Sequence, residues 1–121
     1  MNGIERVGVI GGGMMGSGIA KVVSRAGIDV VLVEVSADAV KAASERVEAS
    51  LRRAESRGKI EAAEVTEVLG RITYTEDLDA LADRDLVVEA ASEDEHTKLE
   101  LFASVGKILT KDDAILASNS S

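Results

Sequence analysis

A glycine-rich turn near the amino terminus constrains the fold more than any other feature of the chain. The apolar run Val7–Ile10 enters this turn, and a helical pattern leaves it. Three glycines in the turn have the spacing G-x-G-x-x-G: Gly11, Gly13 and Gly16. A second apolar run, Ile28–Val33, follows and ends at the carboxylate of Glu34. This order of strand, glycine turn, helix, strand and acid is typical of a dinucleotide-binding unit in a doubly wound α/β sheet.

Each of the three positions in such a turn requires glycine for a different physical reason. Gly11 allows a bend too tight for a Cβ atom, Gly13 lets the backbone contact a pyrophosphate, and Gly16 lets the helix lie close to the strand. The phosphates then lie at the start of the helix, beside Met14 and Met15, where unpaired N–H groups and the helix dipole favour negative charge. The sequence therefore predicts a phosphate-binding backbone in this turn.

The acid after the second apolar run bears on which dinucleotide is bound. Glu34 stands 18 residues after Gly16 and can accept hydrogen bonds from the ribose hydroxyls of adenosine. A carboxylate there favours NAD over NADP, because it repels a 2′-phosphate and no Arg or Lys lies between Glu34 and Val40 to receive one. The alternative is a solvated acid at a strand end. FAD proteins share the glycine spacing, so the spacing alone does not name the cofactor.

The composition narrows the class of protein. At 121 residues the chain is expected to form one domain, and 45% of its residues are hydrophobic but only 2% are aromatic, which suits a buried parallel sheet. The net charge of −8 argues against a nucleic-acid partner. No cysteine and a single histidine, His96, argue against a metal site. With no apolar run of about 18 residues and no leader pattern, we expect no membrane segment and a cytoplasmic location.

The hydrophobic pattern predicts alternating strands and helices. Strands are expected at 4–10, 29–34, 72–75, 85–90 and 114–118. Helices are expected at 14–26, from the Ser36 cap to about Gly58, at 62–69, and from the capping-box segment Ser92–Glu95 onward. The fold class is therefore α/β, a Rossmann-type doubly wound parallel sheet with a helical hairpin inserted between strands two and three.

Two helical faces are expected to pack on the sheet. The first helix should bury Ile19, Ala20, Val22, Val23 and Ala26. The last helix should bury Leu99, Phe102 and Leu109. Both expectations rest on apolar residues recurring at helical spacing.

Three segments resemble, in order, the motifs of one known family. The helix start Gly13–Ala20, the strand Asp85–Ala90 (D-L-V-V-E-A) and the segment Ala117–Ser121 (A-S-N-S-S) are similar to those of the 3-hydroxyacyl-CoA dehydrogenases. The helical hairpin ending at Arg57–Lys59 also stands where that family has one. The resemblance covers the whole chain, and members acting on 3-hydroxybutyryl-CoA are the most similar. The departures are small: Gly12 replaces the usual Ala, Met14 a usually polar residue and Ser120 the usual Thr.

The resemblance implies roles for further cofactor-binding residues. Glu34 would bind the adenosine ribose of the cofactor. Ala90 would offer its backbone to the cofactor near the fourth strand. Glu93 and Lys98 would lie along the nicotinamide half. From the residues alone, Lys98 is equally an i,i+4 partner of Asp94. Glu93 is equally an acid that complements the helix dipole.

The resemblance also implies residues on the substrate side. Asn119 would lie beside the nicotinamide ribose, and Ser121 would hydrogen-bond the 3-oxygen of the substrate as a catalytic residue. The same residues could form an ordinary turn after a strand. Ser50 and Arg57, on the hairpin, would contact the CoA moiety. The alternative for Ser50 is a plain helix-surface serine, and for Arg57 a charge that complements a helix carboxyl terminus.

The activity that the resemblance implies is the interconversion of (S)-3-hydroxyacyl-CoA and 3-oxoacyl-CoA by hydride transfer with NAD, in fatty-acid or butanoate metabolism. The family's catalytic histidine and its glutamate partner lie beyond the serine motif, and the chain ends at Ser121. We therefore expect residues 1–121 to be the NAD-binding domain alone, without the helical substrate and dimerisation domain, and to be inactive in isolation. The full-length family member is expected to be a homodimer.

Two other functions remain open from the sequence. The chain could be a stand-alone nucleotide-binding module that performs no chemistry. It could also be the cofactor half of a related NAD-dependent dehydrogenase that acts on polyols or β-hydroxy acids. Binding of both NADH and an acyl-CoA would favour the 3-hydroxyacyl-CoA dehydrogenase domain over these two alternatives.

Overall fold

The computed structural model describes residues 3–91 and 95–118 of the chain. Five parallel strands form one sheet in the order β3-β2-β1-β4-β5. The strands are β1 (Arg6–Ile10), β2 (Asp29–Val33), β3 (Ile72–Thr75), β4 (Leu86–Glu89) and β5 (Ile115–Ser118). The helices are α1 (Met14–Arg25), α2 (Ala37–Ser56), α3 (Ala62–Gly70) and α4 (Glu95–Ile108), with a 3-10 turn η1 (Leu78–Leu81).

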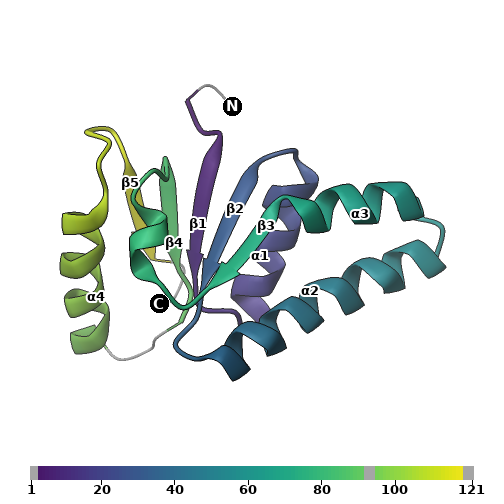
Figure 1. Ribbon diagram of the computed structural model, residues 1–121, viewed down its shortest axis with the longest axis horizontal. Coiled ribbons are helices and arrows are strands. Elements are labelled where there is room, and N and C mark those ends of the chain that lie inside the picture. The colour runs from purple at the N-terminus through teal and green to yellow at the C-terminus, as the bar shows by residue number, and fades with distance from the viewer. Residues whose placement is uncertain (1–2, 92–94, 119–121) are drawn as a thin grey trace.

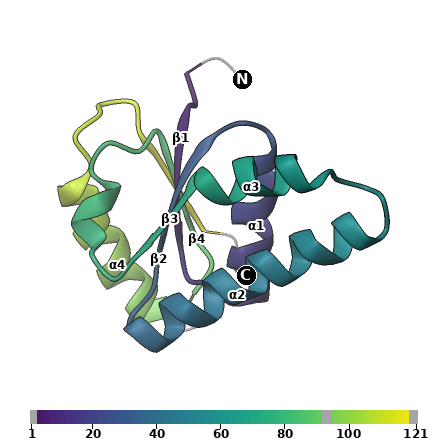
Figure 2. The same ribbon diagram turned by 45° about the vertical axis from the view of Figure 1, so that its right-hand side comes forward.

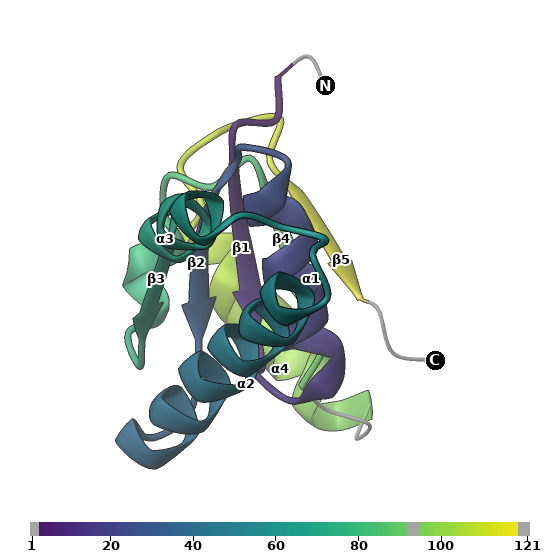
Figure 3. The same cartoon turned by 90° about the vertical axis from the view of Figure 1, so that its right-hand side faces the viewer.

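Helices cover both faces of the sheet. α1, α2 and α3 lie on one side, and α4 with η1 lies on the other (Figures 1 and 2). The helices α2 and α3 form the hairpin between β2 and β3, and Figure 3 shows them in front of the sheet beside α1. The doubly wound parallel sheet and the inserted hairpin predicted from the sequence are both confirmed.

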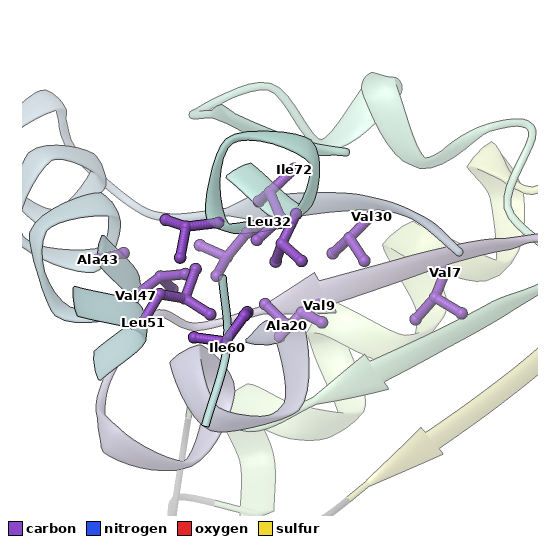
Figure 4. Packing of buried hydrophobic residues seen from close by; sticks show 12 residues of the cluster. Val7, Val9, Ala20, Val30, Leu32, Ala43, Val47, Leu51, Ile60 and Ile72 are labelled. Carbon is purple, nitrogen blue, oxygen red and sulfur yellow. The ribbon is translucent and has the colours of Figure 1, made fainter. Parts of the chain in front are cut away.

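The strands supply a separate apolar cluster to each face, because successive side chains along a strand point to opposite sides. In β2, Val30 and Leu32 join the cluster under α1, α2 and α3 (Figure 4). Val31 and Val33 join the cluster on the α4 side, together with the buried Val105. A strand buried on both faces explains why the sequence shows a continuous apolar run there.

The first helix buries the expected face in part: Ala20 is buried, and Ile19 and Val23 pack against the cluster under α1, α2 and α3. Its buried residues are small: Gly16, Ser17, Ala20 and Ser24. Val22, which was expected to face the sheet, is 63% exposed, and Ala26 is exposed as well. Small residues allow the helix to approach the sheet closely, so the fully buried positions of α1 are not those of its largest apolar side chains.

The last helix also differs in part from expectation. Leu109 packs against the α4-side cluster as expected, but Leu99 is 65% exposed. The stripe that contacts the sheet is Leu101, Val105 and Leu109, at a spacing of four residues. Leu99 lies two residues, about half a helical turn, before Leu101 and therefore points away from the sheet, whereas Phe102 is half-buried.

The start of α2 follows the predicted signal, whereas most of the predicted capping box Ser92–Glu95 lies outside the described residues. The Ser36 side chain accepts a hydrogen bond from the Ala39 N–H (3.1 Å) and caps α2. Gly27 (φ +91°) and Gly58 (φ +73°) follow the ends of α1 and α2 in the left-handed conformation. Within the described part of the chain, none of the helices has the length and apolar character needed to cross a bilayer.

Candidate functional site

Two glycines of the turn are required by close backbone approach at the carboxyl end of β1. Gly11 has φ +100°, and a Cβ atom there would lie 2.7 Å from the Cβ of Ala91, which follows β4. A Cβ atom at Gly16 would lie 1.7 Å from the Gly11 carbonyl oxygen. The turn, α1 and the end of β4 can therefore meet only where these side chains are absent.

The start of α1 is open to an anion. Its first residue is preceded by Gly13, which supplies no capping side chain, and no acidic residue stands in the first turn of α1. A Cβ atom at Gly13 would meet nothing within 4 Å. By contrast, α2 is capped by Ser36 and carries Asp38 in its first turn. The first N–H groups of a helix have no partner within the helix, and no side chain of the described residues caps α1, an arrangement that fits the pyrophosphate of a dinucleotide.

Glu34 is a fixed part of this turn. One carboxylate oxygen accepts the Gly12 N–H (2.7 Å), and the other accepts the Val35 N–H (2.9 Å). Its own backbone N–H donates to the Thr75 carbonyl at the end of β3 (2.9 Å). These bonds hold the half-buried carboxylate in place, unlike the solvated strand-end acid considered from the sequence. A carboxylate has about four lone-pair positions, so acceptor capacity remains for ribose hydroxyls.

A cavity of about 350 Å³ lies at the carboxyl ends of the strands and includes Glu34. Its lining is mostly apolar, with Glu34 and Glu76 as its two carboxylates. The lining residues are Ile10, Gly11, Val33, Glu34, Val35, Glu76, Leu78, Ala91, Thr97 and Leu101. Its size and its apolar walls with a few polar groups are those of a small-molecule site, at the edge where doubly wound sheets bind ligands.

The end of β4 is held by a buried carboxylate. Glu89 is fully buried, and its side chain accepts the Ala91 N–H (2.6 Å) and the Ser118 hydroxyl (3.0 Å). The N–H of Ala90 donates to the Ile10 carbonyl (2.9 Å). Because this N–H is committed to the sheet, the backbone atom that Ala90 can offer to a ligand is its carbonyl oxygen.

Of the other predicted cofactor and catalytic residues, three lie in the described part of the chain and three lie outside it. Met14 (89% exposed) and Met15 (55% exposed) stand in the first turn of α1 beside Gly13. Lys98 is half-buried on α4 and has an interaction partner. Glu93, Asn119 and Ser121 lie outside the described residues.

A second cavity, of about 470 Å³, lies between α1 and α2. Lys21 of α1 donates a hydrogen bond from its Nζ to the Ser50 Oγ of α2 (2.8 Å) across it. Ser50 is therefore more than a plain surface serine. Arg57 is the C-cap of α2, is exposed and does not line this cavity. The structure does not bring the two predicted CoA residues into one pocket.

Ser17 and Arg46 also contact the glycine turn, although neither was predicted as a site residue. The Ser17 hydroxyl (2.8 Å) and the Arg46 Nη1 (2.7 Å) donate to the Gly12 carbonyl. Ser17 could have been found from its place in the first turn of the predicted helix, five residues after Gly12. Arg46 is 34 residues away on the inserted hairpin, and no local pattern links it to the turn. Residues 3–91 and 95–118 contain no group of three metal-ligating side chains.

The chain is similar to dehydrogenase domains over nearly its full length. Residues 6–121 match the family model described as 3-hydroxyacyl-CoA dehydrogenase, NAD binding domain. The 3-hydroxybutyryl-CoA dehydrogenase of Mycobacterium tuberculosis is 48% identical over 118 residues, which are 98% of this chain and 41% of that protein. The 3-hydroxyadipyl-CoA dehydrogenase of Escherichia coli is 37% identical, over 100% of this chain and 26% of its own length.

Solved structures agree with these similarities. The crystal structure of M. tuberculosis FadB2 superposes with a TM-score of 0.97 at 48% identity, covering 99% of this chain and 42% of FadB2. That of (S)-3-hydroxybutyryl-CoA dehydrogenase PaaH1 from Ralstonia eutropha gives a TM-score of 0.93 at 35% identity, covering 98% and 41%. The chain thus spans about two fifths of the length of these relatives.

Proposed function

Because the chain belongs to the family of 3-hydroxyacyl-CoA dehydrogenase NAD-binding domains, we propose that it is the cofactor half of an enzyme that interconverts (S)-3-hydroxyacyl-CoA and 3-oxoacyl-CoA. The proposed substrate is 3-hydroxybutyryl-CoA, after the names of the relatives at 48% identity. NAD bound to such a domain supplies the hydride acceptor of the reaction.

The observation that carries the proposal is the open start of α1. No side chain caps this helix start, the position of a Cβ atom at Gly13 is open, and the Glu34 carboxylate accepts the Gly12 N–H in the same turn. We propose that the turn binds the pyrophosphate and that Glu34 binds the adenosine ribose. The apolar 350 Å³ cavity next to Glu34 would then receive the adenosine.

The remaining cofactor and catalytic roles are proposed from the family motifs. Ala90 directly follows β4 and Lys98 stands on α4, and both are proposed to lie along the nicotinamide half of the cofactor. Glu93 and Asn119 are proposed to complete that half of the site. Ser121 is proposed to hydrogen-bond the 3-oxygen of the substrate and so help to polarise the reacting carbon–oxygen bond.

The hairpin is proposed to contact the CoA moiety. Ser50 faces a cavity whose charged side chains are all basic, namely Lys21, Arg46 and Arg53. An anionic ligand such as a CoA phosphate suits that lining. Arg57 lies at the end of α2, outside this cavity, so its contact with CoA is a separate proposal. The homodimer and the cytoplasmic location expected for the full-length protein stay predictions.

Isothermal titration calorimetry tests the proposal. NADH should bind with a 1:1 stoichiometry, and NADPH should bind more weakly because Glu34 repels a 2′-phosphate. Acetoacetyl-CoA should bind to the NADH complex. Binding of NADH without acetoacetyl-CoA would favour the nucleotide-binding module or the polyol dehydrogenase half. If millimolar NADH gave no heat and no change in fluorescence, the proposed function would be wrong.

A further inference from the structure

The glycine turn contains a flexible peptide that is held from three directions. The run Gly11-Gly12-Gly13 lacks side chains, so ordering it costs more conformational entropy than ordering other residues. Gly12 is nevertheless fixed on both sides. Its N–H donates to Glu34, and its carbonyl oxygen accepts from Ser17 and Arg46.

Of the two donors to this carbonyl, one comes from outside the nucleotide-binding unit. Ser17 belongs to α1 and bonds within its own turn. Arg46 belongs to α2, in the inserted hairpin, and reaches 34 residues back along the chain. The hairpin, which is proposed to serve the substrate, therefore also holds the cofactor turn.

Because a peptide unit is rigid, the hydrogen bond from Arg46 to the Gly12 carbonyl also sets the direction of the Gly13 N–H. The Gly12 carbonyl and the Gly13 N–H belong to one planar trans peptide unit, in which they point in opposite directions. Donors that fix the carbonyl toward α2 therefore fix the Gly13 N–H away from α2. Gly13 precedes the open start of α1, with free space where its Cβ atom would be.

We propose that Arg46 is a positioning residue of the dinucleotide site, which orders the Gly12–Gly13 peptide before the ligand arrives. The inference rests on the proposed NAD-binding function. Preorganisation of this kind raises affinity, because less conformational freedom is lost on binding. The effect should concern the pyrophosphate and leave the adenosine contacts unchanged.

A rival explanation is that Arg46 acts only through its charge. It lines the α1–α2 cavity with Lys21 and Arg53, and any of these cations could attract a phosphate at long range. Arg53 is the matched control, because it lies on the same wall and, among the described contacts, makes none with the turn. A charge effect is screened by salt, whereas a hydrogen bond that orders the turn is screened much less.

The experiment compares Arg46→Met, Arg46→Lys and Arg53→Met with the unchanged chain. Fluorescence titration at low and high salt gives the dissociation constants of NADH and ADP-ribose, and NMR titration gives that of adenosine. We expect Arg46→Met to weaken NADH and ADP-ribose binding about ten-fold at both salt concentrations, as for one charge-assisted hydrogen bond. Adenosine binding should not change, Arg46→Lys should be intermediate, and Arg53→Met should have little effect at high salt.

A second measurement does not depend on the ligand. In the ligand-free protein, NMR relaxation should show a lower order parameter for the Gly13 amide in Arg46→Met than in Arg53→Met. Equal losses in the two methionine variants that vanish at high salt would overturn the inference, as would an unchanged Gly13 amide. Equal loss of adenosine and NADH binding would also overturn it, since it would indicate general damage. If the unchanged chain failed to bind NADH, the proposed function itself would fail.

Discussion

The carbonyl oxygen of Gly11 occupies the space that a Cβ atom at Gly16 would need, since the two would be only 1.7 Å apart. We therefore predict that Gly16→Ala pushes α1 away from the glycine turn. Overpacking of this kind costs about 1–3 kcal/mol of unfolding free energy. It should also weaken NADH binding strongly, because the start of the helix moves relative to the turn. Urea unfolding and fluorescence titration measure the two effects.

Gly18→Ala is the matched control on the same helix. A Cβ atom at Gly18 meets nothing within 4 Å, and its φ is not positive. Alanine in a helix interior is more favourable than glycine by about 0.5–1 kcal/mol, so Gly18→Ala should be neutral or stabilising. If both variants behaved alike, the close approach of Gly16 to Gly11 would have no energetic importance.

Replacing Glu34 should change the choice between NADH and NADPH. In Glu34→Gln the repulsion of a 2′-phosphate is removed, while one oxygen remains to accept the Gly12 N–H. NADH binding should weaken by about 1–3 kcal/mol, as for a lost hydrogen bond to a charged group. NADPH binding should weaken less or improve. A ratio of the two dissociation constants that stayed the same would show that the carboxylate does not face the ribose.

The glycine at position 12 is explained by Ala43 of α2. A Cβ atom at Gly12 would lie 2.4 Å from the Cβ of Ala43. We predict that Gly12→Ala lowers the unfolding free energy by about 1–3 kcal/mol. Ala43→Gly alone should cost about 1 kcal/mol as a glycine in a helix. The double variant should lose less than the sum, and a double-mutant cycle from urea unfolding gives the coupling. Strict additivity would contradict the contact.

Sequence reasoning succeeded for features that are local in the chain. The strand runs, the Ser36 cap and the glycine spacing each depend on neighbouring residues, and the structure places all of them as expected. The buried Ser17 and Ser24 of α1 were missed, because close packing does not follow the hydrophobicity of single side chains, as the exposed Val22 shows. Arg46 was missed because its contact with Gly12 exists only once the hairpin has folded against the turn.

Asp85 gives the fold a defined sensitivity to acid. It accepts a hydrogen bond from Lys111 and the backbone N–H groups of Glu5 and Arg6, which lowers its pKa from 3.8 to about 2. Because the pKa is lower in the folded state, the carboxylate stabilises the fold above about pH 4. That contribution is lost as the pH falls toward 2.

The variant Asp85→Asn should therefore lose less stability than the unchanged chain between pH 4 and 2. Unfolding free energies from urea titrations across this range provide the comparison. An NMR titration of the Asp85 carboxyl carbon provides an independent check. A midpoint near the ordinary value of 3.8 would contradict the bonds described for this carboxylate.

Tyr74 carries a buried hydroxyl that has no hydrogen-bond partner in the described part of the chain. Burial, and secondly the negative charge of Glu48, raise its pKa from 10.0 to about 12. The folded state thus holds the phenolic proton more tightly than the unfolded state. Stability should fall as the pH rises from 10 to 12, and Tyr74→Phe should abolish this fall.

At neutral pH, Tyr74→Phe should be neutral or stabilising by up to about 1 kcal/mol, because it removes a polar group that is buried without a partner. Tyr74 is the single tyrosine of the chain, so the ultraviolet absorbance of tyrosinate reports on it alone. Its titration midpoint should lie near 12 in the folded protein and near 10 in urea. A folded-state midpoint near 10 would mean that the hydroxyl reaches solvent, and the variant should then show no advantage at neutral pH.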